Sequence, residues 1–240
     1  MKTWLTSRGH EVHRVLSGRC NCHLVCGEKG YLLVDCGGKR HWKRLCDRLQ
    51  SLGVSPDAPL SLVLTHAHFD HAENAAALKR EFNAAILVHE NAANYLRKGE
   101  NPPIHGTLAP TRLMTRILNA SPWLAQRLRY TGVSPDRRVH DETDLRSAGF
   151  PVTLLPTPGH TSGSMSVIVD NQIALTVDAL FGVFPGSAFP PFAEDPGELV
   201  RSWKKLLDTG CSLFLPAHGR PRSRATLHRQ YRKHAGRRCL

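Results

Sequence analysis

The chain has 240 residues, of which 41% are apolar and 22% are charged, which fits an ordinary globular protein and excludes a small disulfide-stapled scaffold. No apolar run approaches the roughly 20 residues that a helix needs to cross a bilayer, and the first ten residues lack a signal-peptide stretch. We therefore expect one domain over 1–240, a cytoplasmic location and no membrane partner.

The net charge of +12 comes from two basic segments. Residues 97–138 carry eight Lys/Arg and two acids (+6), and residues 216–240 carry eight Lys/Arg and no acid (+8), so the rest of the chain sums to −2. Such segments fit a solvated surface or a surface that attracts an anionic ligand.

The seven cysteines do not form the pattern of a secreted disulfide framework. Their number is odd and no CxxC pair is present. We expect most of them to be buried free thiols that pack as small apolar groups. They are Cys20, Cys22, Cys26, Cys36, Cys46, Cys211 and Cys239.

The N-terminal half alternates short apolar runs with helical patterns. A turn at 27–30 between two apolar runs predicts a hairpin, and apolar residues at helical spacing predict a helix that Gly53 ends. A strand–helix–strand order then implies a parallel crossover and an α/β sheet. The predicted strands are 12–16, 22–26, 31–34, 60–64 and 85–88, and the predicted helices are 42–52 and 72–82.

The middle of the chain interrupts this order. Residues 97–135 are rich in proline and basic residues, with one helix predicted from about Thr111 to Tyr130, and we interpret them as a helical insertion or lid. Regular elements then resume. The predicted strands are 152–155, 165–169, 173–177 and 213–215, and the predicted helices are 196–208 and 225–234.

The strongest chemical signal is the segment Thr65–His71 (THAHFDH), which directly follows a predicted buried strand. Neutral imidazoles and carboxylates are ligands that suit zinc and similar divalent metals. On an extended segment, His66 and His68 point to the same side and can hold one ion. Asp70 and His71 follow the turn, so they can reach a second ion.

Three more metal-ligand types follow later strands. His160 lies in PGHTSGS after the strand 152–155, Asp178 directly follows the strand 173–177, and His218 lies in PAHG after the strand 213–215. Ligand sites in α/β sheets gather outside the carboxyl ends of strands. Four strand ends that each present such a residue indicate one shared site.

With these residues, the sequence resembles the metallo-β-lactamase superfamily and, within it, the glyoxalase II-like hydrolases, over about residues 21–219. The resemblance implies an α/β (α+β) fold, a four-layer αββα sandwich with a helical insertion at 97–135. It also implies the role of each site residue. His66, His68 and His160 would hold a first metal, Asp70, His71 and His218 a second, and Asp178 would bridge them, while Asp35 would orient the metal loop by hydrogen bonds.

The resemblance implies a hydrolase with two divalent ions as cofactors. Zinc is the first expectation, and iron, manganese or nickel suit the same ligands. Two such ions lower the pKa of a shared water and generate hydroxide at neutral pH, and Asp70 would help to orient that nucleophile. The expected substrate is a small, anionic molecule with an ester-like bond, such as a thioester or a lactone.

Other residues are candidates for contacts around the site. The loop 181–192 offers Phe181 and Phe184 as an apolar wall for the substrate, or as core packing. Ser162 and Ser164 are expected to support the turn of His160, and His89 is a weaker candidate for the site. Four arginines of the insertion are candidates for contact with a carboxylate or phosphate. They are Arg112, Arg116, Arg127 and Arg129.

Alternatives to this hydrolase remain open at the level of sequence. A persulfide dioxygenase-like oxidoreductase would hold a single iron with His66, His160 and Asp178. A phosphodiesterase or nuclease would use the same ligands, but the basic C-terminal segment has only Tyr231 for base stacking, so we do not expect a nucleic-acid partner. Only 21 residues follow Gly219, too few for the glutathione-binding domain of full glyoxalase II enzymes. No feature indicates an oligomeric state.

Overall fold

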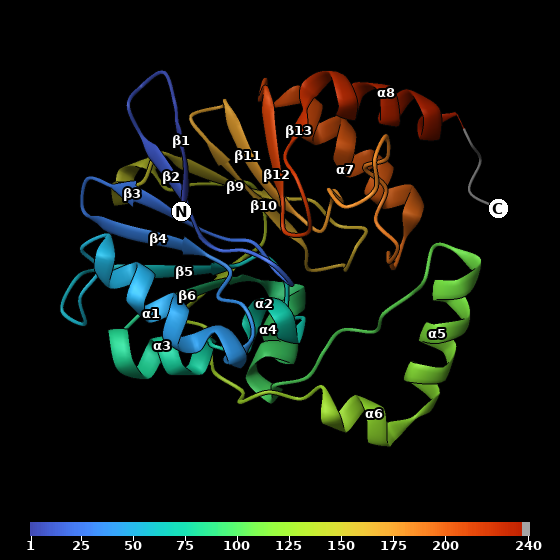
Figure 1. The fold of residues 1–240 in the computed structure, drawn as a ribbon, viewed down its shortest axis with the longest axis horizontal. Coiled ribbons are helices and arrows are strands. Elements are labelled where there is room, and N and C mark those ends of the chain that lie inside the picture. Colours follow the sequence, from blue (N-terminus) through green and yellow to red (C-terminus); the bar gives the residue numbers. More distant parts are fainter. Residues whose placement is uncertain (237–240) are drawn as a thin grey trace.

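Two β-sheets lie face to face in the middle of the molecule, and helices cover the outer face of each (Figure 1). This computed structural model describes residues 1–236. Cys239 and the last two arginines of the basic C-terminal segment therefore lie outside the described residues.

The first sheet has seven strands in sequence order. Its first four strands pair antiparallel, whereas β4 to β7 pair parallel because helices cross between them. The strands are β1 (Lys2–Leu5), β2 (Glu11–Leu16), β3 (Cys22–Gly27), β4 (Gly30–Val34), β5 (Leu60–Leu64), β6 (Ala85–His89) and β7 (Arg137–Val139). The associated helices are η1 (Lys39–His41), α1 (Trp42–Ser51), α2 (Phe69–Ala72), α3 (Ala75–Phe82) and α4 (Glu90–Lys98).

The second sheet has six strands in the order β13-β12-β11-β10-β9-β8. Only the β11–β12 pair is parallel, because helix α7 connects these two strands. The strands are β8 (Thr143–Asp144), β9 (Val152–Pro156), β10 (Met165–Val169), β11 (Ile173–Val177), β12 (Leu213–Pro216) and β13 (Arg222–Ser223). The helices are η2 (Arg146–Ala148), α7 (Pro196–Asp208) and α8 (Arg224–Ala235).

Three apolar layers hold this stack together. In β5, Leu62 and Leu64 pack in the layer under α1 and α3, whereas Val63 packs between the sheets. Alternate side chains of one strand point to opposite faces, so a strand that is apolar throughout indicates two covered faces. Trp203 and Phe214 belong to the third layer, between the second sheet and α7. The predicted four-layer αββα sandwich is confirmed.

The insertion forms an arm of two helices, α5 (Ala109–Ala120) and α6 (Pro122–Arg127), which stand beside the sandwich (Figure 1). The prediction of one helix from Thr111 to Tyr130 is wrong. Ser121 between the two helices is extended (φ −109°, ψ 102°) because the ring of Pro122 disfavours the helical conformation at the residue before it.

Some elements of the structure were not predicted from the sequence, and one helix begins later than predicted. Strands β7, β8 and β13 are short and charged, so they lack the apolar alternation that identifies a strand, and β1 and α4 were also not predicted. The helix predicted over 72–82 begins at Ala75, because Ala72 ends the separate short helix α2 and Asn74 is the N-cap of α3. Within residues 1–236, no helix has both the length and the apolar character that a bilayer crossing requires.

Candidate metal centre

All seven side chains predicted as metal ligands converge at one end of the sandwich, where strands of both sheets end. The segment with His66, His68, Asp70 and His71 leaves β5 of the first sheet. His160, Asp178 and His218 follow β9, β11 and β12 of the second sheet. The centre therefore lies between the two sheets, and each sheet contributes residues to it.

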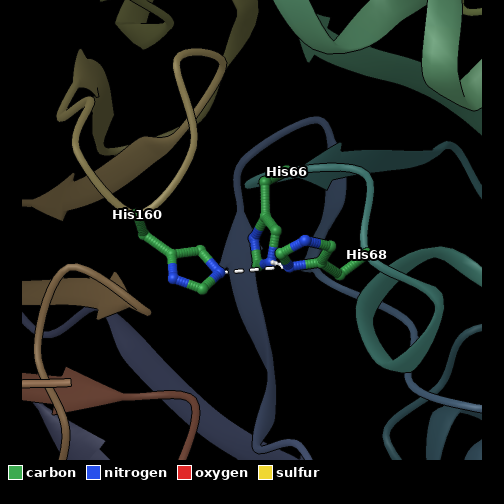
Figure 2. Close-up of side chains that lie close together, drawn as sticks. All are labelled: His66, His68 and His160. Carbon is green, nitrogen blue, oxygen red and sulfur yellow. Dashed lines mark hydrogen bonds between the residues drawn. The ribbon is translucent and has the colours of Figure 1, made fainter. Parts of the chain in front are cut away.

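Three histidine nitrogens face one another in the first group (Figure 2). The Nδ1 atom of His68 lies 2.9 Å from Nε2 of His66 and 3.1 Å from Nε2 of His160. All three rings are buried. The distances place three ring nitrogens around one point.

The opposite nitrogens of His68 and His160 have backbone carbonyls as partners. Nε2 of His68 lies 3.3 Å from the oxygen of Pro102, and Nδ1 of His160 lies 3.1 Å from the oxygen of Phe192. Carbonyls only accept, so these nitrogens carry the protons. The facing nitrogens of both rings therefore present lone pairs to each other.

The protonated nitrogen of His66 can also be assigned from its hydrogen-bond partner. The Thr65 hydroxyl donates to the carboxylate of Asp35, at 2.9 Å, so it accepts from Nδ1 of His66 at 3.2 Å. The Nε2 atom of His66 then also presents a lone pair to the centre. Three converging lone pairs repel one another unless a cation lies between them, and this is the donor set of a divalent metal.

A second group surrounds the carboxylate of Asp178. Its Oδ2 atom lies 3.4 Å from Nε2 of His160 and 3.6 Å from Nε2 of His71, and its Oδ1 atom lies 3.3 Å from Nε2 of His218. Asp70 completes the group, with Oδ2 at 3.7 Å from Nε2 of His218 and 3.9 Å from Nε2 of His71. Asp178 therefore lies between the two groups, which is the position that a bridging ligand needs.

Two polar atoms of this group are buried without a hydrogen bond of good geometry within the described residues: Nε2 of His71 and Oδ1 of Asp178. A buried polar atom with no partner costs about 1–3 kcal/mol of stability. Both atoms point into the centre, where a cation would satisfy them. The residues present therefore fit a metal site.

The protonation of the first group suits metal binding. Burial lowers the pKa of His66 and His68 well below the ordinary histidine value, and the neighbouring histidines lower it further. Burial also lowers the pKa of His160. Neutral imidazole is the form that binds a metal.

The second group carries the opposite shifts. Burial opposes ionisation of Asp178, but His218, His71 and His160 outweigh it and hold the pKa of this carboxyl well below its usual range. Burial lowers the pKa of His71, whereas the acidic groups of Cys20, Asp35, Asp70 and Asp178 raise it, with a net increase. The pKa of His218 is also raised, because Asp178 outweighs burial.

Asp35 makes the contacts expected of a residue that orients the metal loop. Its buried carboxylate accepts from the backbone N–H of Thr65 at 2.9 Å and lies 2.8 Å from Nδ1 of His71. These contacts turn Nε2 of His71 towards Asp70 and Asp178. The backbone of Asp35 is left-handed (φ 58°), a conformation that aspartate tolerates better than most residues.

The backbone before Asp178 is unusual. Val177 has a φ of +46°, an outlier for a β-branched residue, and the pairing of β11 with β12 shifts register there. Such strain persists only where the surroundings enforce it. Gly159, with a φ of +128°, has no room for a Cβ, which would lie 2.3 Å from the backbone nitrogen of Leu199. This glycine lets the loop of His160 pack closely on α7.

Several supporting residues had no signal in the sequence, because their partners are distant in the chain. The buried Asn21 side chain donates to the carbonyls of Pro216 and Gly219, on either side of His218. The Tyr130 hydroxyl donates to the carbonyl of Ala67 at 2.9 Å. Both residues hold ligand-bearing loops through long-range hydrogen bonds that no spacing rule predicts.

A cavity of about 190 Å³ opens onto the centre. Phe181 and Phe192 line it, and so do Met114 and Leu118 of α5. Phe184 does not line it, and its ring instead lies 5.7 Å from that of Phe181. Phe181 therefore lies on the cavity, where the sequence predicted an apolar wall. Phe184 does not line the cavity and contacts Phe181 instead.

Other candidates lie outside the centre. None of the four arginines of the insertion lines the cavity. Arg129 pairs with Glu100 at 2.7 Å, and Arg127 lies over the ring of Trp123. His89 accepts from the backbone of Asn91 at the start of α4. Ser164 bonds the backbone N–H and the hydroxyl of Thr161, beside His160, at 3.1 and 2.9 Å.

The chain matches a protein family and is similar to several known proteins. The family described as "Metallo-beta-lactamase superfamily" matches residues 17–218. "Probable metallo-hydrolase YqgX" of Bacillus subtilis is 26% identical over 164 residues, which cover 68% of this chain and 67% of that protein. "Acyl-coenzyme A thioesterase MBLAC2" of Gallus gallus is 32% identical over 172 residues, which cover 68% of this chain and 56% of that protein.

Solved structures share the fold. The di-iron-bound form of TTHA1623 superimposes with a TM-score of 0.63 at 24% identity, over 90% of this chain and 96% of that one. At this identity, the likeness shows the fold alone.

Proposed function

Because the chain belongs to the metallo-beta-lactamase superfamily and is a metallo-hydrolase of that superfamily, we propose that it is a glyoxalase II-like hydrolase with a dinuclear metal site. His66, His68 and His160 hold the first ion. Asp70, His71 and His218 hold the second, and Asp178 bridges the two. The proposed ions are zinc, and iron, manganese or nickel suit the same ligands.

One observation carries the proposal. Nδ1 of His68 and Nε2 of His160 lie 3.1 Å apart with both lone pairs facing, because each ring donates its proton to a carbonyl on the other side. This contact is unfavourable without a cation between the rings. A different observation supports a second ion: Nε2 of His71 is buried without a hydrogen bond to the described part of the chain and lies 3.6 Å from Asp178 and 3.9 Å from Asp70.

Bound divalent ions would lower the pKa of water and polarise the oxygen of the scissile carbonyl. The chain's own residues supply the rest. The carboxylate of Asp70 lines the cavity and is partly exposed, so it can accept a hydrogen bond from the attacking water. Phe181 and Phe192 line the cavity beside His218 and His160, where they exclude bulk water and hold the apolar part of a substrate.

The substrate that we propose is an anionic thioester or a related ester with an apolar acyl group. The apolar lining of the cavity supports the acyl group, and the similarity to a protein named as an acyl-coenzyme A thioesterase supports a thioester bond. Arg19, whose guanidinium lies 5.5 Å from the ring centre of Phe69, is the cation that we assign to the anionic part. Phe69 itself lines the cavity.

The proposed location is the cytoplasm. Six free cysteines are present in the described part of the chain, and four of them are buried. Reduced thiols of this kind are typical of reducing compartments.

The test combines metal analysis with a hydrolase panel of thioesters, lactones, β-lactams and phosphodiesters. We expect two divalent ions per chain and hydrolysis of an anionic thioester. The His68→Ala variant should lose roughly 10³-fold in activity, about 4 kcal/mol, because it removes a ligand of the first ion. His228→Ala, at an exposed position of α8, is the matched control.

Two outcomes would overturn the proposal. Unchanged hydrolysis by His68→Ala would mean that the turnover comes from another site or a contaminant. One iron per chain together with oxygen uptake on a persulfide would instead assign the chain to the mononuclear oxidoreductases.

A further inference from the structure

Helix α5 packs on the protein through its polar side chains. The hydroxyl of Thr111 donates to the carbonyl of Pro191 at 3.0 Å, and the hydroxyl of Thr115 accepts from the backbone N–H of Gly106 at 3.1 Å. The side-chain amide of Asn119 donates to the carbonyl of Ile104 at 2.8 Å. These residues are spaced by four, so they share one face, whereas an ordinary surface helix buries its apolar face.

The apolar face of α5 points to solvent instead. Leu113 and Ile117, also four residues apart, are 62% and 58% exposed, and Trp123 of α6 is 60% exposed. The described residues contain nine strongly exposed large apolar side chains, and seven of them lie on this arm or on the adjoining loop. These seven are Leu108, Leu113, Met114, Ile117, Trp123, Val183 and Phe184. A patch of this kind marks a binding surface.

The positive charge of the arm indicates an anionic partner. Residues 101–135 contain four arginines and no acidic residue. Arg112 and Arg116 each precede an exposed apolar residue and are themselves exposed, one helical turn apart. A second copy of the chain would bring like charges together in a symmetric contact. An apolar face edged with arginines, with a tryptophan beside it, instead fits an anionic lipid interface.

We propose that α5 and α6 bind the surface of an anionic phospholipid membrane. Leu113, Ile117 and Trp123 enter the boundary between headgroups and acyl chains, and Arg112 and Arg116 contact lipid phosphates. This departs from the expectation of no membrane partner, which considered only helices long enough to span a bilayer. A helix that lies in the interface needs an amphipathic face, and α5 has one within 12 residues.

The arm also connects this surface to the metal centre. Met114 and Leu118, on the next edge of α5, line the cavity that contains His68 and Asp178. Docking of the exposed face would therefore bring the cavity close to the lipid, where an ester with a long acyl chain is concentrated. Lipid binding itself does not depend on the proposed hydrolase function.

The test measures co-sedimentation of the full chain with vesicles of phosphatidylcholine alone and of phosphatidylcholine with phosphatidylglycerol. We expect binding to the anionic vesicles that weakens with salt, and a blue shift of tryptophan fluorescence on binding. L113S/I117S should weaken binding at least tenfold. R112A/R116A should weaken it roughly tenfold or more, on anionic vesicles only.

Matched controls separate the arm from general surface effects. Leu5→Ser removes an equally exposed leucine (65%) on β1, and R137A/R138A removes the same charge from exposed positions of β7. Neither should change binding by more than about twofold, within the range of neutral surface substitutions.

Three results would overturn the proposal: no binding to anionic vesicles, equal binding by L113S/I117S, or a dimer in sedimentation that this variant abolishes. The last result would assign the face to a second copy. Hydrolysis of a water-soluble ester by L113S/I117S should stay within about twofold of the original chain. Failure of lipid binding and failure of the hydrolase proposal are thereby distinguishable.

Discussion

The loops around Asp178 bury histidines and carboxylates, whereas helix α5, which lines the same cavity, exposes Leu113 and Ile117 to solvent. Both regions reverse the usual distribution, in which apolar groups lie inside and polar groups lie outside. A buried charged cluster without a counter-ion is unfavourable, and so is an apolar helix face in water. Each region is therefore incomplete by itself, and the kind of side chain indicates the missing partner, a cation in one case and an apolar surface in the other.

The largest expected effect is the loss of the bridging carboxylate. Asp178→Asn removes the charge between the two histidine groups, so one or both ions should bind weakly and hydrolysis should fall roughly 10³-fold, about 4 kcal/mol. Activity on the best thioester and metal content per chain measure this. Asp141→Asn, at an exposed position away from the centre, is the control and should leave both unchanged. Full metal content and full activity in Asp178→Asn would contradict the prediction that this centre depends on the Asp178 carboxylate to hold its ions.

The second prediction contrasts two leucines in opposite surroundings. Leu64→Ala empties a fully buried site just before the metal loop and should cost about 2–5 kcal/mol of unfolding free energy. Leu113→Ala removes a side chain that is 62% exposed and should change it by less than about 0.5 kcal/mol. Urea denaturation of both variants measures the difference. A large loss in Leu113→Ala would mean that the outer face of α5 is packed in solution.

The third prediction concerns the support of His71. Asp35→Asn keeps the shape of the side chain but removes the carboxylate that orients the ring, so metal affinity should fall about 10–100-fold. Competition with a chelator measures it, and Asp47→Asn, which is exposed on α1, is the control. An unchanged affinity would show that the loop holds His71 without this contact.

The fourth prediction concerns the dependence of metal binding on pH. The pKa values of His71 and His218 are raised, so at a pH below these values the metal-free protein holds a proton on each of the two rings. Metal binding displaces these protons, so affinity should be full above the raised pKa values and fall as the pH decreases through them. The fall is at most about tenfold per pH unit for each displaced proton. Zinc titrations at several pH values test this, and an affinity that does not change below neutral pH would contradict it.

The convergence of the seven candidate ligands could be predicted from the sequence because their signal is local. His66, His68, Asp70 and His71 lie within six positions after an apolar run, and His160, Asp178 and His218 each follow another strand. Each of these patterns depends only on neighbours in the chain. The structure brings all seven side chains together, and the family match covers most of the same segment.

The supporting contacts could not be predicted in this way. Asn21 reaches a loop nearly 200 positions further along the chain, and Thr65 fixes the tautomer of His66 only because its hydroxyl donates to Asp35. Pro122 already indicates a helix break at Ser121 in the sequence, but we predicted one long helix across this position. Long-range hydrogen bonds leave no periodic trace in the sequence.

The sequence by itself determined the order of the apolar strands and of most of the helices, and the set of residues available as metal ligands. These depend on apolar periodicity and on short motifs. Tertiary structure alone decided which ring nitrogens carry lone pairs, which of the phenylalanines lines the cavity, and that α5 turns its apolar side outward. The physical reason is that orientation depends on partners far along the chain, and a helical pattern reads the same whether its apolar face is buried or exposed.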